Sequence, residues 1–206
     1  MTYWTVPPMW KGRWVAVLAS GPSMSPQVAD SVRHLPRVVV NTTYLLAPDA
    51  DVIYASDAKW WATNPAALAC SGVKCSIEPR PGAWPAVPAG VVVLRNTGRE
   101  GYDRDPGCAR TIQNSGAVGI QIAIKAGADR VLLLGFDMRG KNWHQPHKLG
   151  TSSAEFLARC VVGYRSFARS IAPLGVAILN CTPNSALDCF PKVSLAEALA
   201  DYSEAA

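Results

Sequence analysis

The sequence has no run of apolar residues long enough to cross a bilayer, for which about 20 are needed. Its first residues lack the basic segment and following apolar segment that mark a secretory signal. It has no C-x-x-C pair and only three histidines, and their spacing does not suit a zinc site. Charged residues make up 17% of the chain and form no dense basic run. We therefore expect a cytoplasmic protein with no membrane span.

The cysteines also lack the features of a disulfide framework. Several of them lie next to apolar residues, which is typical of reduced thiols in or near a core. The six are Cys70, Cys75, Cys108, Cys160, Cys181 and Cys189.

What the chain does have is enough apolar sequence for one sizeable core. Its 206 residues are 49% hydrophobic and contain no low-complexity stretch, so we expect a single domain over residues 1–206. The formal net charge of +5 is modest. It favours anionic partners, such as nucleotides or a nucleic acid, and leaves a homo-oligomer open.

Apolar strands alternate with helical segments along the chain. Strands are predicted at 14–19, 37–40, 51–55, 72–77, 90–94, 130–134 and 176–179. Helices are predicted at 26–34, from about 59, and at 115–126, 152–172 and 194–202, with a loop-rich connection over about 71–113. Several strands are continuous apolar runs, as parallel strands buried on both faces are. The pattern predicts a Rossmann-like, doubly wound and mostly parallel sheet with helices on both faces.

The first predicted strand runs into a short turn, and a helix follows from Pro26. The turn consists of Ser20, Gly21, Pro22 and Ser23. We expect its backbone N–H groups to lack partners and to lie beside a helix N-terminus, which would suit a phosphate. This segment is the main sequence indication of a nucleotide site.

Polar residues follow the other strands too, at Asn41, at Ser56 and Asp57, at Asp137 and at Asn180. Ligands of parallel α/β sheets bind outside the carboxyl ends of the strands. Asn41 can contact a base edge or a ribose, although an ordinary turn explains it equally well. Asp57 can accept from a hydroxyl or cap the next helix. Asp137 can bind a ligand or tie down the loop after it.

Two further segments carry candidate chemistry. Asn114, Ser115 and Gly116 begin the predicted helix 115–126, where they can cap the helix, bind a phosphate or do both. His144 and His147 lie in a loop beside several cations, which would lower their pKa values and suit a general base. A surface role is the alternative for both histidines.

Together these segments resemble a known family. Gly21-Pro22-Ser23, Asn41, Asn114-Ser115-Gly116, Leu134–Asp137 and Cys181–Leu187 occur in the order found in bacterial sialyltransferases of glycosyltransferase family 42 and in related phage proteins. The resemblance spans about Val15 to Leu187. It implies a metal-independent, inverting transferase that moves a sugar from a nucleotide-activated donor, CMP- or UDP-linked, to a hydroxyl acceptor.

The resemblance also implies residue roles. Ser20, Gly21, Asn41, Ser115 and Asp137 would hold the nucleotide, and Ser56 or Asp57 would lie near the donor sugar. His144 or His147 would be the catalytic base, and we favour His147 because the turn at Pro146 can direct it inward. Where the family has tyrosines that stabilise the leaving phosphate, this chain has Met138 to Lys141, of which Arg139 or Lys141 could neutralise the phosphate.

Two alternatives belong to other functional classes. The chain also resembles the MptE-like Rossmann proteins, which include diphosphotransferases that use ATP and a divalent metal. Asp57 and Asp137 would then be metal ligands. A nucleotide-binding module without catalysis is the third interpretation. We rank glycosyl transfer first because a metal-dependent diphosphotransferase has less need of the histidine pair.

The acceptor is open at this stage. Four arginines are spread through the loop-rich connection, and they would suit an anionic acceptor, such as the modified bases of phage DNA. They are Arg95, Arg99, Arg104 and Arg110.

Overall fold

The computed structural model describes residues 1–80, 82, 86–144 and 152–205. Within these residues the strands form one parallel sheet in the order β1-β6-β5-β4-β3-β2-β8-β9, with β7 paired to β6. The strands are β1 (Thr2–Tyr3), β2 (Trp14–Leu18), β3 (Arg37–Val40), β4 (Val52–Tyr54), β5 (Val73–Ile77), β6 (Val91–Asn96), β7 (Cys108–Ala109), β8 (Arg130–Leu134) and β9 (Ala177–Asn180). The predicted doubly wound α/β class is confirmed.

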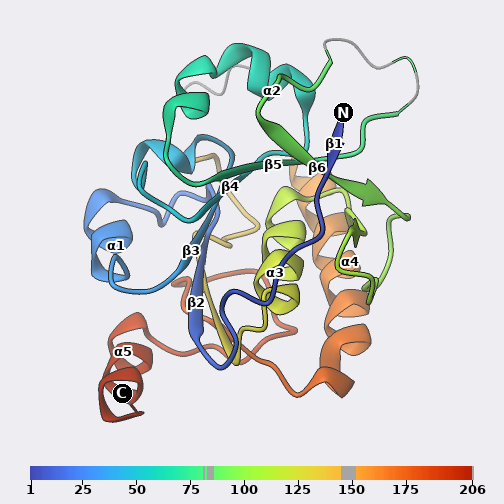
Figure 1. The fold of residues 1–206 in the computed structure, drawn as a ribbon. Coiled ribbons are helices and arrows are strands. Elements are labelled where there is room, and N and C mark those ends of the chain that lie inside the picture. The colour runs from blue at the N-terminus through green and yellow to red at the C-terminus, as the bar shows by residue number, and fades with distance from the viewer. Residues whose placement is uncertain (81, 83–85, 145–151, 206) are drawn as a thin grey trace.

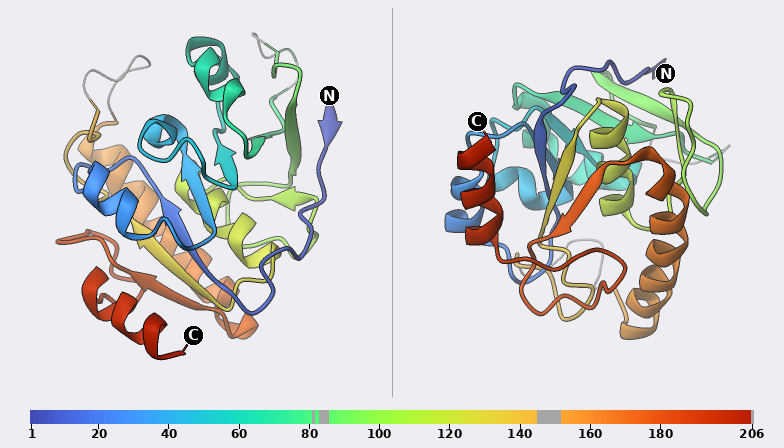
Figure 2. Two further views of the ribbon diagram at one scale, coloured as in Figure 1. Left: turned by 60° about the vertical axis from the view of Figure 1, so that its left-hand side comes forward. Right: turned by 90° about the horizontal axis from the view of Figure 1, so that it is seen from below.

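Helices cover both faces of this sheet (Figures 1 and 2). The α-helices are α1 (Pro26–Ser31), α2 (Ala58–Thr63), α3 (Ser115–Lys125), α4 (Ala154–Ile171) and α5 (Leu195–Ala205). Short 3-10 helices are η1 (Asn41–Leu45), η2 (Pro65–Ala69) and η3 (Ala172–Leu174). Side chains from α3 and α4 pack in one core cluster, and side chains from α1, α2 and α5 pack in the other.

The alternation of side chains along β2 explains the two clusters. Val15 and Val17 point into the cluster with α3 and α4, whereas Ala16 and Leu18 point into the other. All four are fully buried. A parallel strand covered on both faces needs apolar residues at every position, and this requirement produces the continuous apolar run in the sequence.

Helix α3 lies close against the centre of the sheet because it is built from small residues. A Cβ added at Gly119 would lie 3.0 Å from Val17 Cγ1 and 3.2 Å from Val40 Cγ2. A larger side chain there would push the helix outward, so the small residue sets the distance between α3 and strands β2 and β3.

The chain changes direction in the sheet at β2. From β2 it adds strands on one side, as far as β6, and α3 then carries it to β8 on the other side of β2. The carboxyl ends of β2 and β8 are therefore followed by loops that leave in opposite directions. This is the topological switch point at which open α/β sheets bind their ligands.

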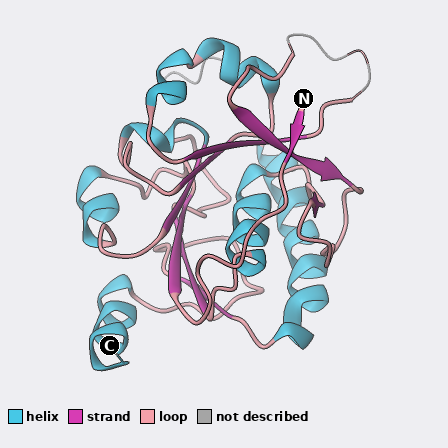
Figure 3. Cartoon of the chain, viewed as in Figure 1, coloured by secondary structure: helices cyan, strands magenta, loops and turns pink. Residues whose placement is uncertain are grey.

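The predicted loop-rich connection over about 71–113 is partly regular. It contains β5, β6 and β7, and its other described residues form loops and turns without a helix (Figure 3). The two-residue strands β1 and β7 were not predicted from the sequence, because they are too short to carry an alternating pattern.

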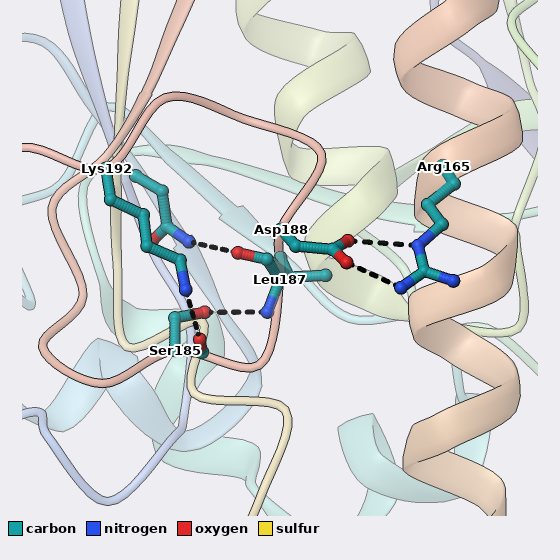
Figure 4. A network of polar contacts seen from close by, with 6 residues as sticks. Arg165, Ser185, Leu187, Asp188 and Lys192 are labelled. Carbon is teal, nitrogen blue, oxygen red and sulfur yellow. Dashed lines mark hydrogen bonds and ion pairs between the residues drawn. The ribbon is translucent and has the colours of Figure 1, made fainter.

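The loop after β9 is held by polar contacts, and these account for Asn180. The Asn180 side-chain amide donates to the carbonyl oxygen of Leu187 at 3.3 Å, and its oxygen accepts from the backbone N–H of Thr182. In Figure 4, Asp188 faces Arg165 of α4 and accepts two hydrogen bonds from its guanidinium. Asn180 is 1% exposed, so its polar atoms stabilise this loop.

All six cysteines lie in the described part of the chain and are free thiols. Cys75, Cys108, Cys160 and Cys181 are buried, as apolar sequence contexts predicted. Within the described residues, the helices are too short or too polar to span a membrane.

Candidate functional site

A pocket of about 250 Å³ lies at the switch point between β2 and β8. We call it the switch-point pocket. It is formed by the ends of β2 and β8, the start of η1, and the N-terminal residues of α3 and α4. The predicted site residues that line it are Ser20, Gly21, Asn41, Asn114, Ser115, Gly116 and Arg139.

The turn after β2 does not offer the free N–H groups that the sequence suggested. Gly21 donates its N–H to the carbonyl oxygen of Gly135 at 2.9 Å, and Ser23 donates its N–H to Asp137. The expectation that these two N–H groups await a phosphate is therefore wrong. Gly21 continues the backbone pairing of β2 with β8, and the Asp137 side chain accepts the N–H of Ser23, so both donors have partners within the protein.

Glycine is required at position 21 because the turn after β2 lies very close to the residues that follow β8. A Cβ at this position would lie 2.0 Å from Asp137 Oδ2 and 2.5 Å from the Gly135 carbonyl oxygen. Ser20 has a similar structural duty, because its hydroxyl donates to the Val40 carbonyl oxygen at 3.1 Å. Gly21 and Ser20 line the pocket, yet their polar contacts are made within the protein and join the turn after β2 to the ends of β8 and β3.

Asp137 lies behind the pocket and is not among its described lining residues. Its carboxylate accepts a 2.8 Å hydrogen bond from the Ser23 hydroxyl and is 6% exposed. Burial raises its pKa, and the hydrogen bonds from Ser23 oppose that shift. Asp137 and Ser23 therefore fix the turn after β2, in line with the structural alternative for Asp137, and Pro22 in the same turn is not among the described lining residues of the pocket.

Three residues that line the pocket have left-handed backbone conformations without being glycine. They are Asn41 (φ 53°), Gln113 (φ 55°) and Met138 (φ 51°). Each such residue costs on the order of 1–3 kcal/mol, a strain found preferentially at functional sites. The strain here is concentrated on the three loops that meet in the pocket.

Packing explains part of this strain. Ile112, which precedes Gln113, also has a positive φ of 49°. Its side chain lies against α4, where a Cβ at Gly163 would come within 2.4 Å of Ile112 Cγ2. The packing of Ile112 against α4 therefore fixes the backbone conformation just before Gln113. This conformation places Gln113 and the start of α3 at the pocket.

Asn114 caps helix α3. Its side-chain oxygen accepts the N–H of Gly116 at 2.9 Å and the hydroxyl of Tyr164 at 2.8 Å. Gly116 lets the helix begin close to β8, because a Cβ there would lie 2.8 Å from Phe136 Cε1. Asn114 and Gly116 therefore place the helix N-terminus, as the capping alternative predicted.

Ser115 presents its side chain differently. Its hydroxyl is 3.0 Å from the Ser56 hydroxyl, which in turn is 2.8 Å from the hydroxyl of Tyr54. Tyr54 is fully buried in β4, and burial raises its pKa far above the ordinary value. Tyr54 therefore keeps its proton and can donate it to Ser56. The chain of hydroxyl groups ends at Ser115, which lines the pocket.

The charge in the pocket has one sign. Arg139 and Lys141 line it, and its described lining residues include no carboxylate. The Arg139 charge acts on the Asp137 carboxyl, whose pKa it tends to lower. Cations concentrated in a polar hollow attract an anionic ligand, so the pocket is suited to a phosphate-bearing molecule.

The two predicted catalytic residues that the structure describes, Asp57 and His144, are not among the residues that line the switch-point pocket. Asp57 caps α2 by accepting the N–H of Lys59 at 2.8 Å, and it does not line the switch-point pocket. The ring of His144 packs edge-on against Trp143, and the backbone N–H of Trp143 donates to the Ser20 carbonyl oxygen at 3.1 Å. His144 is thereby held near the carboxyl end of β2. His147 lies outside the described residues.

Some lining residues were not predicted from the sequence. Gln113, Asn142, Ser152, Phe156 and Leu157 also face this pocket. Phe156 and Leu157 sit in the first turn of α4, and the signal that could have identified them is the serine pair before that helix. Nothing in the sequence places the start of α4 beside β2.

Ser56 lines a second, neighbouring pocket of about 630 Å³. We call it the arginine pocket, because Arg80 and Arg99 lie in its wall.

Among the described residues there is no group of three or more His, Cys, Asp or Glu side chains that could hold a metal ion. No protein-family model matches this chain, and no curated protein sequence matches it.

Proposed function

We propose that the switch-point pocket binds the nucleotide part of an activated sugar, CMP- or UDP-linked, and that the protein transfers the sugar to an acceptor hydroxyl. The observation that carries the proposal is the presence of Arg139 and Lys141 in the same pocket as the N-terminal residues of α3. Cations and a helix N-terminus both favour the negative charge of a nucleotide phosphate.

The remaining polar groups fit a nucleotide. The Asn41 side chain has both donors and an acceptor, as recognition of a base edge or a ribose requires. Ser115 adds a hydroxyl at the start of α3. A charged hydrogen bond of this kind contributes about 1.5–3 kcal/mol to binding.

In the proposed reaction the acceptor oxygen attacks the anomeric carbon as the bond from that carbon to the nucleotide phosphate breaks. One of His144 and His147 takes the acceptor's proton. Arg139 and Lys141 neutralise the negative charge that develops on the leaving phosphate. In keeping with the sialyltransferase resemblance, the proposal includes no resident metal ion.

A nucleotide screen by thermal unfolding tests this proposal. CMP, UDP and ATP are each added with and without Mg²⁺, and we expect CMP or UDP to raise the Tm without the metal. A ligand at 100 times its Kd stabilises the folded state by about 2.7 kcal/mol. Mass analysis of candidate acceptors then identifies any transferred sugar.

A matched pair of variants locates the binding. Arg139 and Arg104 are both exposed, but only Arg139 lines the switch-point pocket. Arg139→Gln should weaken nucleotide binding at least 10-fold, whereas Arg104→Gln should leave it within about 2-fold.

Three outcomes would contradict the proposal. Stabilisation only by ATP with Mg²⁺ would favour diphosphate transfer. Binding without any transferred group would favour a non-catalytic module. Equal effects of the two arginine variants would place the nucleotide elsewhere.

A further inference from the structure

The arginine pocket lies beside the switch-point pocket along the carboxyl ends of the strands. Its wall contains Ser56 after β4, Arg80 after β5, and Asn96 and Arg99 at and after the end of β6. Like its neighbour, it has no carboxylate among its described lining residues. It is therefore a second cationic hollow at the same edge of the sheet.

The two pockets share a wall. Gln113, Asn114 and Ser115 line both of them. The hydroxyl pair of Ser56 and Ser115, 3.0 Å apart, stands at this shared wall. Ligands in the two pockets would therefore meet at the N-terminus of α3.

Both arginines are available to a ligand. Within the described residues neither Arg80 nor Arg99 forms an ion pair. The nearby carboxylate of Glu78 is used otherwise, because it accepts from the Tyr3 hydroxyl and from the backbone N–H of Asn96.

The other arginines of this region do not extend the pocket into a longer basic surface. Arg95 lies over the ring of Tyr3, with its guanidinium carbon 4.6 Å from the ring centre. Arg110 donates to the Glu100 carbonyl oxygen at 2.8 Å. Arg104 lines a different hollow, with Lys125 at the C-terminus of α3. A nucleic acid needs a continuous basic track, and these positions do not provide one.

We infer that the arginine pocket binds a single anionic group, a phosphate or a carboxylate, of a small acceptor molecule. Arg80 and Arg99 supply the charge, and the acceptor hydroxyl is then held near Ser115, facing the nucleotide in the other pocket. The role of this small molecule as the acceptor rests on the proposed function, whereas the existence of the anion site does not. This inference replaces the DNA acceptor that the arginine spacing in the sequence suggested.

Calorimetric titration of inorganic phosphate tests the anion site. The protein is first saturated with CMP, so that the switch-point pocket is occupied, and a low-salt buffer without phosphate is used. We expect phosphate to bind, Arg99→Gln to weaken it at least 10-fold, and Arg80→Gln to weaken it in the same direction. Arg104→Gln, which removes the same charge at a distance, should change the affinity less than 2-fold.

A second arm distinguishes small anions from nucleic acid. A single-stranded oligonucleotide that binds tightly, and that loses affinity equally on substitution of Arg95, Arg99 or Arg104, would overturn the inference in favour of an extended surface. Equal effects of Arg99→Gln and Arg104→Gln on phosphate would also overturn it, as would the absence of phosphate binding. Unchanged thermal unfolding shows that each variant is folded.

The two proposals fail in different ways. If no nucleotide binds, the phosphate titration is performed on the free protein, and a site that depends on Arg99 but not on Arg139 supports the anion site alone. If CMP binds and depends on Arg139, but phosphate does not depend on Arg99, the proposed function stands and this inference is wrong.

Discussion

Replacing Tyr54 with phenylalanine tests whether the buried hydroxyl chain prepares Ser115 for a ligand. The two contacts allow Tyr54 to donate to Ser56 and Ser56 to donate to Ser115, an arrangement that leaves the Ser115 proton for a molecule in the pocket. The variant keeps the ring and removes one oxygen from a fully buried site. Ser56 then loses the partner that fixes the direction of its proton.

The expected magnitudes follow from the contacts. One lost hydrogen bond reduces the free energy of unfolding by about 0.5–1.5 kcal/mol. A hydrogen bond from Ser115 to a phosphate contributes about 1.5–3 kcal/mol, and each neighbouring bond strengthens it by roughly 10–30%. Tyr54→Phe should therefore weaken nucleotide binding about 1.3- to 5-fold, and Ser115→Ala about 10- to 150-fold.

Tyr164→Phe is the matched control. Tyr164 is also fully buried, and its hydroxyl also makes one side-chain hydrogen bond, but to Asn114. Urea unfolding should show similar losses for the two tyrosine variants, whereas calorimetric titration with the bound nucleotide should show a larger loss for Tyr54→Phe. Wild-type affinity in both Tyr54→Phe and Ser115→Ala would refute the reasoning.

Three other perturbations follow from the geometry. Gly21→Ala places a methyl group within 2.0 Å of Asp137 Oδ2, so we expect about 3 kcal/mol or more of lost stability in urea, and a near-normal midpoint would contradict this packing. Burial lowers the pKa of Lys125 to about 8, below its value in the unfolded chain. The folded state then binds fewer protons between about pH 8 and 10.5, so stability relative to Lys125→Gln should rise with pH over that window, and a flat difference would refute it. His147→Ala should abolish sugar transfer and keep nucleotide affinity; loss of transfer in His144→Ala instead would move the base, and transfer in both variants would remove the histidine mechanism.

Much of the fold could be predicted because it depends on local patterns. The apolar runs of β2, β3 and β8 and the small residues of α3 are each sufficient to identify a buried element. The 3-10 helix η1 was not predicted, because the chain is turned there by an asparagine with a positive φ, Asn41, and the sequence does not reveal that conformation. The same holds for β1, which is a strand only because β6 lies beside it.

The site was predicted less completely, because it depends on which polar groups already have hydrogen-bond partners within the protein. The sequence correctly brings Ser20, Asn41 and Ser115 to one edge of the sheet. It does not reveal that the N–H of Gly21 is used by Gly135, because that contact joins two strands more than one hundred residues apart in the chain. The Asp57 carboxylate likewise caps its own helix, through the N–H of Lys59.

Polar residues at the ends of parallel strands have two competing uses. The strands end where backbone groups lose their sheet partners, so some side chains must satisfy those groups, as Ser20 does for the Val40 carbonyl oxygen. Only the polar groups left over can bind a ligand. In this pocket those include the cations, the Asn41 side chain and the outer hydroxyl of the Tyr54–Ser56–Ser115 chain, rather than the turn after β2. A phosphate would therefore bind between Arg139, Lys141 and the start of α3, and the Gly-Pro-Ser turn would act by keeping β2 and β8 close enough to form that space.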